Sequence, residues 1–191
     1  MPDPFAHGLP TVDGARLRLR HPRDPDAPDI LAVFGDPQAL RYWSHGPLAD
    51  LEAARAYLAD IDAGWRDRSL FQWGIADRET DRLIGTVTLT SWDRDNRHAE
   101  IGFILHPSRQ GVGLASEAVR TVLTFGFGPM GLHRVEADVD PANEGSIRLL
   151  ERIGFQREGT FRERWWVFET WKDSAMFGLL ASDFASSRTE G

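Results

Sequence analysis

A glycine-rich segment at residues 110–115, Gln-Gly-Val-Gly-Leu-Ala, has the composition of an anion-binding loop. Its two glycines let the backbone turn and leave no Cβ to obstruct a ligand. Apolar residues recur at helical spacing from Leu114 to Leu123, so a helix begins inside the segment. Because the first turn of a helix has unpaired amide groups and partial positive charge, we predict a site for a phosphate or pyrophosphate there.

The same glycines also suit a tight turn that binds nothing. The segment is not a Walker loop, because it lacks Gly-Lys-Ser/Thr, and it is not the Gly-x-Gly-x-x-Gly of dinucleotide-binding folds. The neighbouring elements therefore have to decide between a ligand site and a simple turn.

The elements around the loop predict an open edge in a mixed sheet. The short apolar run at 101–105, ended by His106-Pro107, is typical of a strand buried on both faces. Across residues 15–180 the patterns predict the order β-α-α-β-β-β-α-β-α-β-β. Strand–helix–strand crossovers around the glycine-rich helix imply one parallel pair in an otherwise antiparallel sheet. A ligand would bind where neighbouring strands part, at their carboxyl ends.

The length and composition fit one soluble domain with a hydrophobic core, since 41% of the 191 residues are hydrophobic and 27% are charged. Residues 1–14 are rich in Pro, Gly and Asp and are predicted to form a loose lead-in. Residues 182–191 are predicted to form a disordered tail. The core of this single domain, 1–191, would then span about residues 15–181.

The composition also excludes several classes of function. No apolar run reaches the ~20 residues that a membrane span needs, and no secretory signal is recognisable. The chain has no cysteine, which rules out disulfides, a Cys nucleophile and thiolate metal sites, and we expect a cytoplasmic protein. The net charge of −7 argues against nucleic acid as the main partner and suits a cationic substrate such as an amine. Six scattered histidines form no i, i+4 pair, so we expect no metal site.

Several segments, in this order, resemble the GCN5-related N-acetyltransferases (GNAT). The loop matches their acetyl-coenzyme A motif Gln/Arg-x-x-Gly-x-Gly/Ala, and residues 143–155, Asn-Glu-Gly-Ser-Ile-Arg-Leu-Leu-Glu-Arg-Ile-Gly-Phe, match a second segment. The resemblance covers about residues 15–181. It implies an α+β fold with a central mixed, mostly antiparallel sheet of about seven strands flanked by about four helices.

Within that family the chain is most similar to the RimJ/RimL-type branch, which acetylates the N-termini of ribosomal proteins. The residues that carry this likeness are Leu17-Arg18-Leu19-Arg20, Ala99-Glu-Ile-Gly-Phe103, Asn143-x-x-Ser146, and Trp171-x-Asp173 followed by Gly178-Leu-Leu.

The resemblance implies a set of residues that bind acetyl-coenzyme A, the expected cosubstrate. The main chain of Phe103, Ile104 and Leu105 would pair with the pantetheine arm like an added strand. The pyrophosphate would lie on the loop residues Gln110, Gly111, Val112, Gly113, Leu114, Ala115 and Ser116. Asn143 would bind the cofactor near the pantetheine, although an ordinary helix N-cap explains the same residue, and both roles can coexist.

The resemblance also implies candidate catalytic residues. An ammonium cannot attack a thioester, so a base must remove a proton, and Glu100 is the first candidate. Asp138 occupies the place where other N-terminal acetyltransferases carry a base. Many members have a Tyr acid where this chain has Leu150, so Ser146, the proposed acid of the ribosomal-protein branch, becomes the best donor. Glu100 and Asp138 can equally be structural or solvated carboxylates, and Ser146 can be a capping residue.

Aromatic residues on the first two helices and the closing hairpin are expected to form the acceptor site. The candidates are Tyr42, Trp43, Trp92, Trp165 and Trp166, although each can instead be core packing. Because consecutive strand residues face opposite sides, one of Trp165 and Trp166 should lie outside the core. Glu163 and Glu169 are candidates for the negative side of an amine site.

The sequence therefore favours direct acetyl transfer from acetyl-coenzyme A to a primary amine, first of all a protein or peptide N-terminus. A small-molecule amine acetyltransferase, or a transferase of a longer acyl group, has the same motifs. A non-catalytic coenzyme A-binding sensor or scaffold is the alternative from another class. Because relatives often pair through the closing strands, a homodimer is also an expectation.

Overall fold

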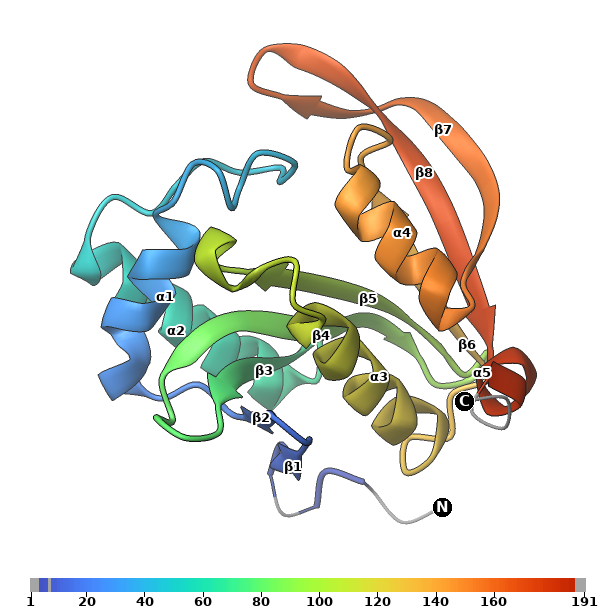
Figure 1. Ribbon diagram of the computed structural model, residues 1–191, viewed down its shortest axis with the longest axis horizontal. Coiled ribbons are helices and arrows are strands. Elements are labelled where there is room, and N and C mark those ends of the chain that lie inside the picture. Colours follow the sequence, from blue (N-terminus) through green and yellow to red (C-terminus); the bar gives the residue numbers. More distant parts are fainter. Residues whose placement is uncertain (1–3, 7, 188–191) are drawn as a thin grey trace.

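The computed structural model describes residues 4–6 and 8–187. In this part of the chain a single mixed sheet of eight strands has the order β1-β2-β3-β4-β5-β6-β8-β7. Its strands are β1 (Val12–Asp13), β2 (Leu17–Arg20), β3 (Leu70–Asp77), β4 (Leu83–Asp93), β5 (His98–Leu105), β6 (Arg134–Val139), β7 (Gln156–Val167) and β8 (Thr170–Leu180). The α-helices are α1 (Ala27–Phe34), α2 (Leu51–Asp67), α3 (Leu114–Phe127), α4 (Glu144–Ile153) and α5 (Ala181–Ser187). The predicted α+β class with one mixed sheet is confirmed (Figure 1).

Helices cover the sheet on both faces because strand residues alternate in direction. On one face α1 and α2 pack with Ala76, Leu83 and Ile104 in one hydrophobic cluster. On the other face α3 and α4 pack in a larger cluster that includes Ile75 and Leu105. In each of the adjacent pairs 75–76 and 104–105, one residue packs in one hydrophobic cluster and its neighbour packs in the other. This alternation fixes the register of the central strands.

The only parallel pair in the described sheet is β5 with β6, and it is short. The two strands pair from His98 with Arg134 to Glu100 with Glu136, and no pairing follows. Strand β5 continues to Leu105 against β4, and β6 continues to Val139 against β8. The parallel pair that the sequence predicted is therefore confirmed, and the two strands part after Glu100.

The first residues of the chain differ from the loose lead-in expected for 1–14. Phe5 is 1% exposed and stacks on Phe71 with ring centroids 4.5 Å apart. Val12 and Asp13 pair with Leu19 and Arg18 as strand β1. This prediction was wrong because a single apolar residue among Pro and Gly gives no periodic signal, yet it fills a gap in the core.

The predicted disordered tail at 182–191 is also partly wrong. Residues 181–187 form helix α5, and residues 188–191 lie outside the described part. Phe184 is 4% exposed and its ring lies 5.3 Å from that of Phe127. One buried aromatic residue therefore holds α5 against α3. With β1, α5 accounts for the difference from the expected seven strands and four helices.

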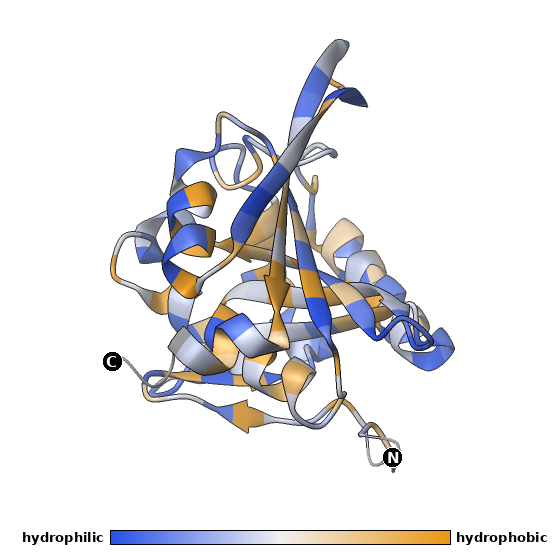
Figure 2. Cartoon of the chain, turned by 90° about the vertical axis from the view of Figure 1, so that its right-hand side faces the viewer, coloured by the Kyte–Doolittle hydropathy of each residue, from blue (hydrophilic) through white to orange (hydrophobic). Residues whose placement is uncertain are grey.

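The hairpin of β7 and β8 extends beyond the body of the protein, over α4 (Figures 1 and 2). Its turn lies at Phe168 and Glu169, both of which have positive φ values. Near its tip the strands pair Trp165 with Lys172 and Trp166 with Trp171. No described helix is both long and apolar enough to cross a membrane.

Candidate active site

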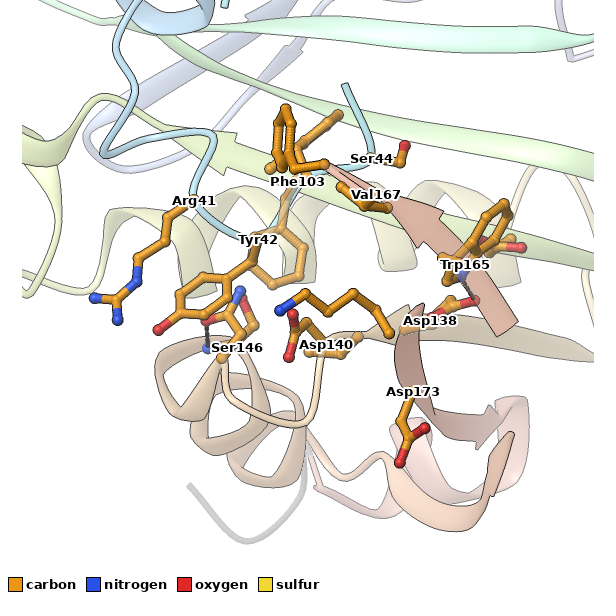
Figure 3. A pocket seen from close by; sticks show the side chains of 18 of the residues that line it. Arg41, Tyr42, Ser44, Phe103, Asp138, Asp140, Ser146, Trp165, Val167 and Asp173 are labelled. Carbon is orange, nitrogen blue, oxygen red and sulfur yellow. Dashed lines mark hydrogen bonds between the residues drawn. The ribbon is translucent and has the colours of Figure 1, made fainter. Parts of the chain in front are cut away.

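A cavity of about 450 Å³ opens where β5 and β6 part. Five segments line it: the loop at 41–44, the middle of β5, the end of β6, the start of α4 and the tip of the hairpin. Figure 3 shows Tyr42, Ser146 and Asp140 from different segments gathered around this space. Of the predicted residues, those that line it are Tyr42, Trp43, Glu100, Phe103, Asp138, Asn143, Ser146 and Trp165.

Glu100 lies in the last paired position of β5, opposite Glu136, directly before the strands part. Its side chain is half-buried. Burial raises the pKa of Glu100, and the nearby carboxylate of Asp138 raises it further, while the guanidinium of Arg164 offsets part of this increase. A carboxylate with a raised pKa is a better proton acceptor than an ordinary surface Glu.

Asp138 is held by three partners from the hairpin. Its Oδ1 accepts a hydrogen bond from Ser174 Oγ. Its Oδ2 accepts one from Trp165 Nε1 at 3.2 Å, and Asp138 and Trp165 are both labelled in Figure 3. Arg164 Nε forms an ion pair with Oδ2 at 3.1 Å. Because both oxygens have partners from the hairpin, Asp138 connects β6 to the hairpin.

Asn143 is the N-cap of α4 and lies beside the cavity. Its Oδ1 accepts a hydrogen bond from the backbone N–H of Ser146 at 3.1 Å. The amide nitrogen of Asn143 has no hydrogen-bond partner among the described residues, so it remains available to donate to a ligand. Leu150, which replaces the Tyr acid of many relatives, is fully buried in the core. Ser146 is therefore the hydroxyl of α4 that lines the cavity.

The glycine loop leads from the end of β5 into α3. Gly111 and Gly113 have φ values of 79° and 84°, a region that favours glycine. Gly113 is the N-cap of α3 and has no side chain to bind the amides of the first turn. A Cβ at Gly111 would meet nothing within 4 Å, so the loop faces open space. The guanidinium of Arg16 donates to Val112 O at 2.9 Å and forms an ion pair with Glu117 in the first turn of α3, also at 2.9 Å, so it holds the loop against the helix.

The predicted cofactor residues thus form a continuous edge. From Glu100 it follows the unpaired side of β5 past Phe103, Ile104 and Leu105 to the loop. Gln110 Nε2 donates to the carbonyl of Leu105 at 3.0 Å and holds the loop to the strand. The backbone amides of the loop and the N-terminus of α3 are suited to a diphosphate.

Two predicted acceptor residues do not line the cavity. Trp92 packs in the core, 5.7 Å from the ring of Phe5 and 5.4 Å from that of Phe71. Trp166 is 57% exposed on the outer face of the hairpin, where its ring lies 5.1 Å from that of Trp171. Both residues lie outside this cavity because β4 carries Trp92 to the α3 face and strand alternation separates Trp166 from Trp165.

The cavity also contains charged residues that the sequence did not identify. Asp140, Asp173, Lys172 and Arg41 line it, whereas Glu163 and Glu169 do not. Nothing in the local pattern indicates these contacts, since they depend on how the loop at 41–44, the end of β6 and the hairpin come together. Only the composition singles out one of these residues, because Lys172 is the single lysine in the sequence.

Comparison with known proteins identifies the family of this chain. A family model described as "Acetyltransferase (GNAT) domain" matches residues 16–156. The chain belongs to the GNAT family. The uncharacterized N-acetyltransferase YoaA of Bacillus subtilis is 33% identical over 172 residues, which cover 90% of this chain and 97% of that protein. The family resemblance is confirmed, and the chain is an N-acetyltransferase.

Other GNAT proteins connect this chain to the RimJ-like branch. The [ribosomal protein uS5]-alanine N-acetyltransferase of Escherichia coli is 27% identical over 135 residues, or 70% of each chain. The fold matches that of Mycobacterium smegmatis RimJ in complex with CoA-disulfide, with a TM-score of 0.85 and 23% identity, over 95% of this chain and 94% of that one.

Proposed function

We propose that this GNAT enzyme transfers an acetyl group from acetyl-coenzyme A to the amine of a protein or peptide N-terminus. The observation that supports this most is the parting of β5 and β6 after Glu100, with the cavity at one end and the glycine loop at the other. An N-terminal acceptor is supported by the relative that acetylates the alanine of ribosomal protein uS5.

In this proposal the open edge of β5 and the loop bind the cosubstrate. The main chain of 103–105 pairs with the pantetheine arm, and the amides of 111–116 bind the pyrophosphate. The unpaired amide nitrogen of Asn143 donates to the cofactor while its oxygen caps α4. The coenzyme A compound bound to the structurally similar RimJ supports the choice of ligand.

Glu100 then removes a proton from the acceptor ammonium, directly or through a water, so that the amine can attack the thioester carbonyl. Ser146 donates a proton or a hydrogen bond to the leaving sulfur. We propose Glu100 over Asp138 as the base because Asp138 is occupied by Ser174, Trp165 and Arg164. Acetyl-coenzyme A supplies the activated acyl group, and the protein positions the amine against it.

The acceptor enters between the loop at 41–44 and the hairpin. Tyr42, Trp43 and Trp165 form an aromatic wall there. The cavity has four carboxylates, of Glu100, Asp138, Asp140 and Asp173, and two cationic side chains, of Arg41 and Lys172. This excess of negative charge favours a cationic amine over an anionic acceptor.

The same excess of carboxylates also favours a second candidate, a small polyamine as the acceptor. A thiol-release assay with acetyl-coenzyme A separates the two. The panel contains short peptides with a free N-terminal Ala or Ser, the same peptides with a blocked N-terminus, and small diamines and polyamines. We expect turnover with the free peptides and none with the blocked ones. Turnover with polyamines alone overturns the N-terminal acceptor, and tight binding of acetyl-coenzyme A with no thiol release on any acceptor supports only a coenzyme A-binding module.

A further inference from the structure

The single lysine of the sequence lies in the proposed acceptor cavity. The sequence has 22 Lys and Arg residues, and all of them except Lys172 are Arg. An Arg guanidinium stays protonated and does not accept acetyl groups at neutral pH, whereas a Lys amine can lose its proton and attack. Lys172 is therefore the only side-chain amine in the sequence that this chemistry can modify.

The register of the hairpin directs Lys172 to the cavity. Lys172 pairs with Trp165, and Thr170 pairs with Val167. Residues directly opposite in an antiparallel pair lie on the same face, and all four line the cavity. Trp166 and Trp171 form the intervening pair and lie on the opposite, outer face.

Lys172 forms no ion pair with any described carboxylate, although three Asp residues line the same cavity. Asp138 is paired with Arg164, and Asp173 accepts from the backbone N–H of Glu163 at 2.8 Å. Asp140 accepts from the backbone N–H of Ala142 at 2.8 Å. The Lys172 amine is thus not held by a counter-ion and can move within the cavity.

We propose that Lys172 is a self-acetylation site, modified within the same molecule. The inference rests on the proposed function, because it uses the same base and the same donor. Glu100 takes a proton from the Lys172 ammonium, and the freed Nζ attacks the thioester carbonyl. A C–N bond forms, the C–S bond breaks, and coenzyme A leaves as a thiolate that takes up a proton.

Acetylation changes what the cavity can bind. It replaces one of two cationic side chains with a neutral amide, so the excess of carboxylates around the acceptor increases. The acetylated enzyme should therefore bind cationic acceptors more tightly than the unmodified enzyme. The longer, neutral side chain also occupies part of the cavity, which disfavours bulky acceptors.

The test incubates the full chain with acetyl-coenzyme A and no acceptor, followed by intact mass and peptide mapping. We expect one acetyl group on Lys172, added at a first-order rate that does not depend on protein concentration. The variant Arg66→Lys supplies an internal control for uncatalysed acetylation, because the Arg66 side chain is 76% exposed on α2, outside the cavity. The lysine introduced at position 66 should remain unmodified while Lys172 reacts.

Two further variants separate the outcomes. Lys172→Arg should abolish side-chain acetylation, and Glu100→Gln should slow it at least tenfold. Equal rates at positions 172 and 66, or a rate that rises with protein concentration, overturn the intramolecular reaction. Acetylation of a free peptide with none on Lys172 overturns this inference and leaves the proposed function standing, whereas no transfer to any amine overturns both.

Discussion

Two carboxylates meet at the edge where β5 and β6 part, and their surroundings give them different properties. Asp138 has three partners from the hairpin, whereas burial and the charge of Asp138 raise the pKa of Glu100. Different surroundings can give two neighbouring carboxylates different roles, one as a proton acceptor and the other as a structural anion. In the proposed mechanism Asp138 would therefore act on the reaction through the pKa of Glu100.

The variant Asp138→Asn tests this electrostatic coupling. Removal of a like charge favours ionised Glu100, so its pKa falls and the acid limb of the kcat/KM profile moves to lower pH. The acceptor amine titrates at higher pH, with a pKa of ~8 for an N-terminus, so the two steps are separable. Far-UV circular dichroism checks that the hairpin remains folded. An acid limb that stays in place or moves to higher pH contradicts the coupling.

Asn143 is predicted to have two separable roles. Asn143→Ala removes the cap of α4 and should lower the free energy of unfolding by ~1 kcal/mol, as urea denaturation would measure. It should also raise the KM for acetyl-coenzyme A. Asn143→Ser retains a capping oxygen but lacks the amide donor, so it should restore stability without restoring KM. Recovery of both by Ser would leave Asn143 as a cap only.

At the scale of elements, the glycine loop and α3 were predictable because their signals are local. Gly111 and Gly113 adopt positive φ values, and α3 begins at Leu114, where the apolar periodicity begins. The cap of α4 by Asn143 was predictable for the same reason. Contacts between distant segments, such as Phe5 on Phe71 and Ser174 on Asp138, leave no local pattern and could not be predicted.

Gly111→Ala tests the loop as an anion site. The left-handed φ should lower stability by ~1 kcal/mol, and the added methyl group projects into the open space that we assign to phosphate, so KM for acetyl-coenzyme A should rise. Gly8→Ala is the matched control, since Gly8 also has a positive φ, 105°, and open space around it. It should lose similar stability with an unchanged KM. If both variants change the KM for acetyl-coenzyme A equally, the loop does not bind the cosubstrate.

At the scale of the whole molecule, the β7–β8 hairpin separates two surfaces. Its inner face closes the cavity with Trp165 and Lys172, and its outer face exposes Trp166 and Trp171, which are 57% and 54% exposed. Strand β7 is also the last strand of the sheet, so its outer edge has no neighbour among the described strands. Exposed aromatic residues beside a free edge are typical of an interaction surface.

We predict that this outer face pairs two copies of the chain, as the family resemblance implied. Sedimentation velocity should give a dimer for the unmodified chain and a monomer for the double variant Trp166→Ser, Trp171→Ser. Leu51→Ser removes an exposed hydrophobic residue of α2, 40% exposed, and should leave the dimer intact. A monomeric unmodified chain at micromolar concentration contradicts this prediction.

The central claim is that Glu100 accepts the proton from the amine that is acetylated. The most direct measurement compares kcat of Glu100→Gln with that of the unmodified enzyme, at saturating acetyl-coenzyme A and with a free N-terminal peptide. We predict a loss of about 100-fold or more, with an unchanged Kd for acetyl-coenzyme A. The raised pKa means that ionised Glu100 destabilises the folded state above that pKa, so Tm at neutral pH should not fall. An unchanged kcat, with the variant folded and the cosubstrate bound, would contradict the claim.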